Sequence, residues 1–236
     1  MRPSVSRWQA IVFDLDDTLY PECDYVLSGF KAVAAWAEVN LDIAAEQGFA
    51  QLQALFDQGV RGDTFNRWLD MHRLNSTTLI ARLIKVYREH TPTITCFPEI
   101  QDMLAELHRS CKLGLVSDGY LDVQQRKFTA LDVAHHFDAV VFSDQWGREF
   151  WKPHTRPFET VLSKLGVEGD DAVYVADNPS KDFLGARQLG MLTIWFKRHG
   201  GEYVRLSPPT PDYAPDTTVS TLDDLRSIVT KGKVKQ

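Results

Sequence analysis

Short apolar runs recur along this chain, and they constrain its fold more than any other feature. The runs lie at 10–13, 113–116, 139–142, 172–176 and 192–196. Each is about five residues long and apolar on both faces, as in a strand of a covered parallel sheet. Helical patterns lie between them, such as 98–108, where Ile100, Leu104 and Leu107 share one face and Pro98 suits the first turn. This alternation predicts an α/β fold with a doubly wound, Rossmann-like parallel sheet.

The stretch 20–90 breaks this alternation. It contains no convincing strand, and apolar stripes at helical spacing run through it, one of them including Val26 and Phe30. Ser76 is a plausible helix cap and Gly59 a plausible helix end. A helical insertion of this length after the first strand fits a mobile cap over an active site better than it fits a loop.

The chain length agrees with one large domain and a small inserted one. A chain of 236 residues exceeds one typical domain without clearly making two. We predict an α/β core domain at 1–19 and 91–236 and a helical cap domain at 20–90. The C-terminal part is expected to close with a strand and a helix near 221–229.

Composition narrows the classes of partner and the compartment. The net charge of −6 argues against nucleic acid or an anionic membrane as the main partner, because both need a basic face. Three scattered cysteines suggest reduced thiols rather than a disulfide framework. The N-terminus has no apolar signal region and no stretch reaches the roughly 18 apolar residues of a membrane span. We therefore expect a cytoplasmic protein, either a monomer or a homodimer.

Carboxylates and a few other polar groups follow the apolar runs where the predicted strands end. Asp14, Asp16 and Asp17 come directly after the first run, although Asp17 is equally well explained as a turn residue. The groups after the other runs are Ser117-Asp118-Gly119, Asp177-Asn178-Pro179 and, just past the third run, Lys152-Pro153. Because ligands of open parallel sheets bind beyond the carboxyl ends of the strands, we expect all of them on one rim. Aspartates are unfavourable to bury unpaired, so the set predicts a site for a divalent cation and a phosphate.

The order of these motifs resembles the haloacid dehalogenase superfamily. Asp14-Leu15-Asp16-Asp17-Thr18 resembles its first motif, Asp-x-Asp-x-Thr after an apolar strand, and Ser117 resembles the second. Lys152-Pro153 resembles the third, and Asp177 with Asp182 resembles the fourth, two acids separated by four residues. The resemblance covers 8–229 and implies a phosphatase with a helical cap of the C1 type. Ala176 stands where the family often has Gly, and Asp118 where Asn is frequent.

The resemblance implies a role for each acid of the first motif. Asp14 would attack phosphorus and form an aspartyl-phosphate. Asp16 would protonate the leaving oxygen and then activate the hydrolytic water. Two carboxylates two positions apart disfavour each other's charge, which would help to keep one of them protonated.

The resemblance also implies which groups bind the phosphate and the metal. Ser117 and Lys152 would bind the transferring phosphoryl group, and Asp118 is predicted with them as a phosphate-binding residue. Helix starts predicted at a capping box beginning with Asp122 and at Pro179 would favour an anion nearby. The expected Mg²⁺ ligands are Asp14, the backbone carbonyl of Asp16, Asp177 and Asp182, the last either directly or through a neighbouring group.

Several activities remain open at this point. A 2-haloacid dehalogenase also uses an aspartate nucleophile, but halide leaves without a proton, so it needs neither a second aspartate nor Mg²⁺. A phosphomutase would use the same motifs. A receiver-like signalling module also clusters acids around Mg²⁺, but it is about half as long and lacks the insertion.

The substrate class is less constrained than the chemistry. A cap over the site favours a small phosphorylated metabolite, a sugar phosphate or a nucleotide. Four residues are candidates for substrate contact, although exposed arginines are more often solvated surface. They are Tyr20, Arg61, Arg67 and Arg148.

Overall fold

A computed structural model describes residues 8–74 and 76–231 of the chain. The chain divides into two compact units. One is an α/β unit formed by Met1–Pro21 and Thr95–Gln236, and the other is a helical unit at Glu22–Ile94. Among the described residues, no helix has the length and apolar character to cross a membrane.

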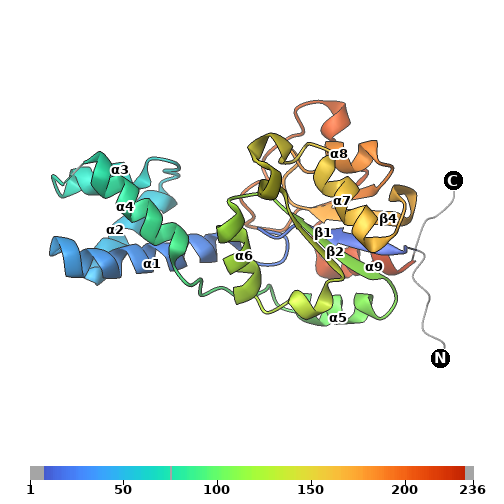
Figure 1. The fold of residues 1–236 in the computed structure, drawn as a ribbon, viewed down its shortest axis with the longest axis horizontal. Helices are drawn as coiled ribbons and strands as arrows, with labels where there is room; N and C mark the ends of the chain where they lie inside the picture. Colours follow the sequence, from blue (N-terminus) through green and yellow to red (C-terminus); the bar gives the residue numbers. More distant parts are fainter. Residues whose placement is uncertain (1–7, 75, 232–236) are drawn as a thin grey trace. The chain divides into compact units, whose positions relative to one another are not determined.

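The α/β unit contains one six-stranded sheet in which every strand pairs in parallel (Figure 1). The strand order is β3-β2-β1-β4-β5-β6. The strands are β1 Ala10–Phe13, β2 Lys112–Ser117, β3 Ala139–Phe142, β4 Ala172–Ala176, β5 Leu192–Phe196 and β6 Thr217–Val219. The predicted Rossmann-like parallel sheet is thereby confirmed.

Helices cover both faces of this sheet (Figure 1). They are α5 Ile100–His108, α6 Leu121–Ala130, α7 Arg156–Leu165, α8 Phe183–Gln188 and α9 Leu222–Lys231. Phe158 and Val161 of α7 and Phe183 of α8 are buried in one core cluster with side chains of β1 and β4. A Cβ atom at Gly114 in β2 would lie 2.8 Å from the Val161 side chain, so α7 packs closely on a glycine. On the opposite face α5 and α9 contact each other.

The strand register explains why the motif residues meet. Phe13 at the end of β1 aligns with Leu115 of β2 on one side and with Val175 of β4 on the other. The backbone N–H of Asp14 donates to the carbonyl of Val175 at 2.9 Å, which continues the ladder one residue further. The residues that follow β1, β2 and β4 therefore emerge at one edge of the sheet.

The described residues of the helical unit form four helices. They are α1 Glu22–Leu41, α2 Ala45–Asp57, α3 Thr64–Met71 and α4 Thr77–Glu89. Ser76 accepts a hydrogen bond from the backbone N–H of Leu79 at 3.2 Å, which confirms the predicted cap. Gly59 has a φ of 81° just after α2, where the predicted helix end lies.

The boundaries of this unit differ by a few residues from the predicted 20–90. Tyr20 belongs to the α/β unit, where its hydroxyl donates to Asp16. Thr93 belongs to the helical unit, where its backbone N–H donates to the Ser28 hydroxyl at 2.8 Å. The function of the unit as a cap stays a proposal.

Three predicted helix starts are corrected. Helix α5 begins at Ile100 because the chain turns at Pro98 and Glu99, whose φ is 67°. The predicted capping box at Asp122 is absent, since α6 begins at Leu121 and the Leu121 N–H donates to Asp144 instead. Helix α8 begins at Phe183 rather than at Pro179.

Candidate active site

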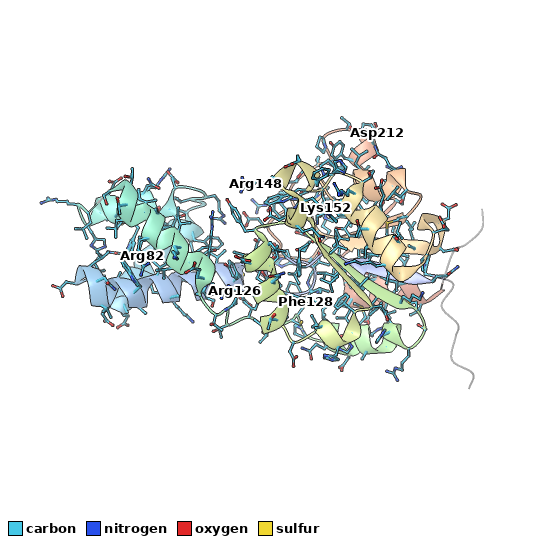
Figure 2. All side chains as sticks on the ribbon, in the orientation of Figure 1. Arg82, Arg126, Phe128, Arg148, Lys152 and Asp212 are labelled. Carbon is cyan, nitrogen blue, oxygen red and sulfur yellow. The ribbon has the colours of Figure 1, made fainter. Side chains whose placement is uncertain are left out.

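Lys152 joins two of the predicted site acids. Its ammonium lies 2.9 Å from Oδ1 of Asp14 and 2.8 Å from Oδ1 of Asp182, and it donates to the Tyr174 hydroxyl at 3.1 Å. The side chains of Lys152 and Asp182 are fully buried. Although burial lowers it, the carboxylates of Asp14 and Asp182 hold the pKa of Lys152 well above its ordinary value. Lys152, visible within the α/β unit in Figure 2, is therefore a fixed positive charge beside Asp14.

Three carboxylates lie together at the edge of the sheet. Asp14, Asp177 and Asp182 each place a carboxylate oxygen within 4.8 Å of the others. Burial raises the pKa of Asp14 to about 6, against the opposing effect of Lys152. Burial, followed by the charges of Asp182 and Asp14, raises the pKa of Asp177 well above its ordinary value. The cluster holds more negative charge than its lysine offsets.

These residues fit a divalent metal ion. Oδ2 of Asp177 is buried and has no hydrogen-bond partner among the described residues. A buried carboxylate oxygen without a partner is costly, and a cation would remove that cost. All the candidate ligands are oxygens, which Mg²⁺ prefers.

The stability of the metal-free protein tests whether the negative charge of Asp177 is unfavourable in this cluster. The unfolded chain has the ordinary Asp pKa of 3.8, and the folded pKa of Asp177 is higher, so the folded state binds the proton more tightly. The proton on Asp177 therefore stabilises the folded state at low pH. This stabilisation is lost as pH rises through the pKa that Asp177 has in the folded state. At pH 8 in EDTA, Asp177→Asn should therefore raise the melting temperature, by about 2–4 °C.

Calorimetry with and without Mg²⁺ measures this effect. Mg²⁺ should stabilise the wild type and leave Asp177→Asn nearly unchanged. Asp212→Asn is the control, because Asp212 is exposed in a different part of the α/β unit (Figure 2). A lower melting temperature for Asp177→Asn than for Asp212→Asn in EDTA would show that the negative charge of Asp177 is not unfavourable in the cluster.

Ser117 and Asp118 follow β2 and face different partners. The Ser117 hydroxyl accepts a hydrogen bond from Nε2 of Gln124 at 2.7 Å. Oδ1 of Asp118 accepts from the Ser143 hydroxyl at 2.6 Å and from the backbone N–H of Lys152 at 3.2 Å. Its Oδ2 lies 3.2 Å from the ammonium of Lys181.

These contacts indicate that Asp118 acts on its neighbours in the site. Although burial raises it, Lys152 and Lys181 hold the pKa of Asp118 below its ordinary value, so the carboxylate is ionised. Lys181 offsets the negative charge that Asp118 brings to the rim. The geometry favours Asp118 as a positioning residue that holds the backbone of Lys152, and direct phosphate binding by Asp118 stays a prediction.

Asp16 lies in a separate network. Its Oδ1 pairs with the ammonium of Lys127 at 2.7 Å and accepts from the Tyr20 hydroxyl, and its Oδ2 accepts from Nε2 of Gln124 at 2.8 Å. Although burial raises it, Lys127 and these hydrogen bonds hold the pKa of Asp16 below its ordinary value. Repulsion from Asp14 therefore does not keep Asp16 protonated in this structure. The expectation of a protonated Asp16 is wrong for this state, because Lys127 dominates its surroundings.

Lys127, Gln124 and Lys181 were missed by the sequence analysis. Lys127 and Gln124 are three residues apart on α6 and so share one helix face. Both are buried, which is unusual for such side chains. The sequence offered only their spacing of three residues on the helix after Ser117, and their burial is visible only in the structure.

The candidate substrate-contact residues are found in different places. Tyr20 is fully buried against Asp16, so we assign it a positioning role. Arg148 donates to the Tyr120 hydroxyl at 2.6 Å and stacks on Trp151, with its Cζ 5.0 Å from the ring centroid. Arg67 pairs with Asp63 at 2.8 Å and is half exposed. Arg61 lines a cavity in the helical unit.

The fold and this cluster define a Rossmann-like α/β enzyme whose site holds an aspartate, a buried lysine and an acid pair that fits a divalent metal ion. The model of the family described as haloacid dehalogenase-like hydrolase matches residues 11–196. The chain belongs to this family.

Known proteins agree with this membership. A glyceraldehyde 3-phosphate phosphatase of Methanopyrus kandleri is 30% identical, with 94% of this chain and 97% of the relative covered. A crystal structure of a phosphatase of this family from Thermococcus onnurineus has a TM-score of 0.60 at 25% identity, with 96% and 100% of the chains covered. The structure of 2-haloacid dehalogenase from Pseudomonas syringae has a TM-score of 0.64 at 24% identity, with 95% and 99% covered, and shows the shared fold.

These comparisons bear on the predicted enzyme class. The family is one of hydrolases, and full-length relatives of the chain are named phosphatases. The prediction of an enzyme of the phosphatase type in this family is therefore confirmed.

Proposed function

We propose that the chain is a Mg²⁺-dependent phosphatase that hydrolyses a small phosphomonoester through phosphorylated Asp14. The observation that carries this proposal is the position of Asp14 at the end of β1. It lies 2.9 Å from the buried ammonium of Lys152 and within one carboxylate cluster with Asp177. A nucleophilic oxygen, a fixed positive charge and a metal-binding acid are what transfer of a phosphoryl group needs.

In the first half of the reaction, a carboxylate oxygen of Asp14 attacks phosphorus and the bond from phosphorus to the ester oxygen breaks. Asp16 must take up a proton before this step, because Lys127 holds its pKa below the ordinary value in this structure. It then donates that proton to the leaving alkoxide. Lys152 and Ser117 bind the oxygens of the phosphoryl group and offset their charge. In the second half, Asp16 takes a proton from water, the water oxygen attacks phosphorus, and inorganic phosphate leaves Asp14 free.

Mg²⁺ would be held by Asp14, Asp177 and the backbone carbonyl of Asp16, with Asp182 supporting Lys152. When bound, it supplies positive charge that offsets the repulsion between carboxylate and phosphate. Asp182 suits a supporting role because its other oxygen, Oδ2, accepts from the backbone N–H of Asn178 at 2.8 Å. This contact fixes the turn that follows Asp177.

The proposed substrate is a three-carbon or similarly small sugar phosphate. The full-length relative named glyceraldehyde 3-phosphate phosphatase supports this class. The helical unit at Glu22–Ile94 would act as the cap that sets substrate choice. A dehalogenase would have no use for Asp16 as an acid or for Asp177 as a metal ligand, so these two residues favour phosphate.

A screen of the purified chain against a panel of phosphorylated metabolites tests the proposal. Glyceraldehyde 3-phosphate and related small sugar phosphates should release phosphate with Mg²⁺ present and not in EDTA. Nucleoside monophosphates in the same panel decide between the two substrate classes. Absence of phosphate release from every member with Mg²⁺ present would end the proposal.

The network around Asp16 leads to a further prediction. Lys127→Met should lower kcat by about 10- to 100-fold, because Asp16 then loses the partner that orients it as acid and base. KM should change little, since Lys127 contacts Asp16 rather than the proposed phosphate groups. Steady-state kinetics on the best substrate of the panel measures both quantities.

Lys127→Arg is the matched variant, because it keeps a cation opposite Asp16. It should recover most of the lost kcat. Equal losses in Lys127→Met and Lys127→Arg, or a loss confined to KM, would show that Lys127 does not act through Asp16.

A further inference from the structure

The helical unit contains a cavity of its own. Its volume is about 300 Å³, and it is lined by residues of α1, α3, α4, the end of α2 and the segment that follows α2. This volume is at the lower end of the roughly 300–1,000 Å³ range of small-molecule sites. All the described lining residues lie between Val26 and Arg88, within one compact unit.

Aromatic rings form much of the cavity wall. The ring of Phe30 lies edge-on to Phe56 at 6.3 Å and to Phe65 at 6.2 Å, and Phe65 lies 5.7 Å from Tyr87. Phe56, Phe65 and Tyr87 pack against the apolar core of the unit but are themselves only half-buried. Covering apolar surface that faces an open cavity with a ligand removes it from water, which favours binding.

The charged groups of the wall are all positive. Arg61 and Arg88 line the cavity, and the described lining residues include no carboxylate. The guanidinium of Arg61 is fixed, since its Cζ lies 3.8 Å from the Phe56 ring centroid and its Nη1 donates to the carbonyls of Phe56 and Val60 at 2.8 and 3.1 Å. A planar guanidinium held in place matches a planar carboxylate.

We propose that this cavity binds a small, flat apolar carboxylate, with the ring system against the aromatic wall and the carboxylate on Arg61 and Arg88. A carboxylate with one negative charge fits better than a phosphate with two, because the apolar wall makes the removal of water from each charge costly. This assignment does not rest on the proposed phosphatase activity.

Calorimetric titration of the full chain with 2-naphthoate, in EDTA, tests the assignment without turnover. Wild type should bind one equivalent saturably. Arg61→Gln and Arg88→Gln should each weaken binding by at least about tenfold, because a charge-assisted hydrogen bond is lost. Arg82→Gln should bind like wild type, since Arg82 lies on α4 near Trp36 and does not line the cavity (Figure 2).

The neutral analogue 2-naphthylmethanol and inorganic phosphate complete the test. The alcohol should bind at least about tenfold more weakly than the acid, since it lacks the charge. Inorganic phosphate should not displace 2-naphthoate. No saturable binding, equal affinity for the alcohol, full binding by both arginine variants, or displacement by phosphate would each overturn the assignment.

Two sources of such a carboxylate can then be separated with p-nitrophenyl phosphate as substrate. Competitive inhibition by 2-naphthoate would identify the acid as part of a substrate. A changed kcat at constant KM would identify a separate regulatory ligand. Either effect should be lost in Arg61→Gln and in Arg88→Gln, whereas an effect that survives in both variants would place the acid elsewhere and overturn the assignment.

Discussion

Replacing Asp14 by asparagine should lower phosphate release by at least about 10⁴-fold, because the amide keeps the shape of the side chain but cannot attack phosphorus. The loss should appear in kcat with every substrate of the panel. The fold should survive, since the sheet and its helices do not depend on this charge and burial of the carboxylate is costly. Kinetics together with circular dichroism measures both parts of the prediction.

Asp17→Asn is the matched control for this variant. Asp17 has a φ of 50°, a conformation that asparagine adopts readily, and it occupies the variable position of the first motif, where its Oδ2 accepts from the backbone N–H of Glu202 at 3.2 Å. Its kcat should stay within about tenfold of wild type. Near-normal phosphate release by Asp14→Asn, or equal losses in the two variants, would show that Asp14 is not the nucleophile.

Removing divalent metal should abolish turnover as completely as the loss of Asp14. Burial and then the charge of Asp182 raise the pKa values of Asp14 and Asp177, and the fully buried Lys152 does not offset this effect. A phosphate dianion would add further repulsion at this place. EDTA should therefore reduce phosphate release to background, and excess Mg²⁺ should restore it.

The same assay separates the proposed phosphatase from a dehalogenase. Halide release from 2-chloropropionate is measured in parallel, with and without EDTA. We expect none under either condition. Metal-independent halide release, with phosphate release absent, would reverse the ranking of these two activities.

Much of the fold could be predicted from local sequence. Runs such as 10–13 and 172–176 are apolar at every position because both faces of a central parallel strand are buried. The convergence of Asp14 and Asp177 followed from a general property of parallel sheets, since their strands β1 and β4 are neighbours. Periodicity and strand-end position were sufficient for these features.

The surroundings of Asp16 could not be predicted in the same way. Lys127 contacts Asp16 across 111 residues of sequence, and an isolated lysine on a helix is ordinarily solvated surface. Only the tertiary packing of α6, which contacts β3, determines that this ammonium is buried. The same holds for Lys181, whose pairing with Asp118 offsets a charge that looked unfavourable in the sequence.

Helix starts were the least predictable local feature. Pro179 and Ser180 suggested a start, but the Asn178 side chain accepts from both the N–H and the hydroxyl of Ser180 and holds these residues in a turn. Side chains of this kind compete with the helix for backbone hydrogen bonds. The sequence pattern alone does not determine whether such residues form a turn or begin a helix.

The central claim is that Asp14 carries the phosphoryl group during turnover. The most direct measurement is rapid acid quenching of the enzyme during turnover of its best substrate, followed by mass spectrometry of the peptide that contains residues 8–31. We expect that peptide to gain the mass of one phosphoryl group at Asp14. The added mass should disappear on treatment with hydroxylamine, which cleaves acyl phosphates, and should be absent from Asp14→Asn. A quenched enzyme that turns over substrate but never carries this mass, or carries it on another residue, would contradict the account.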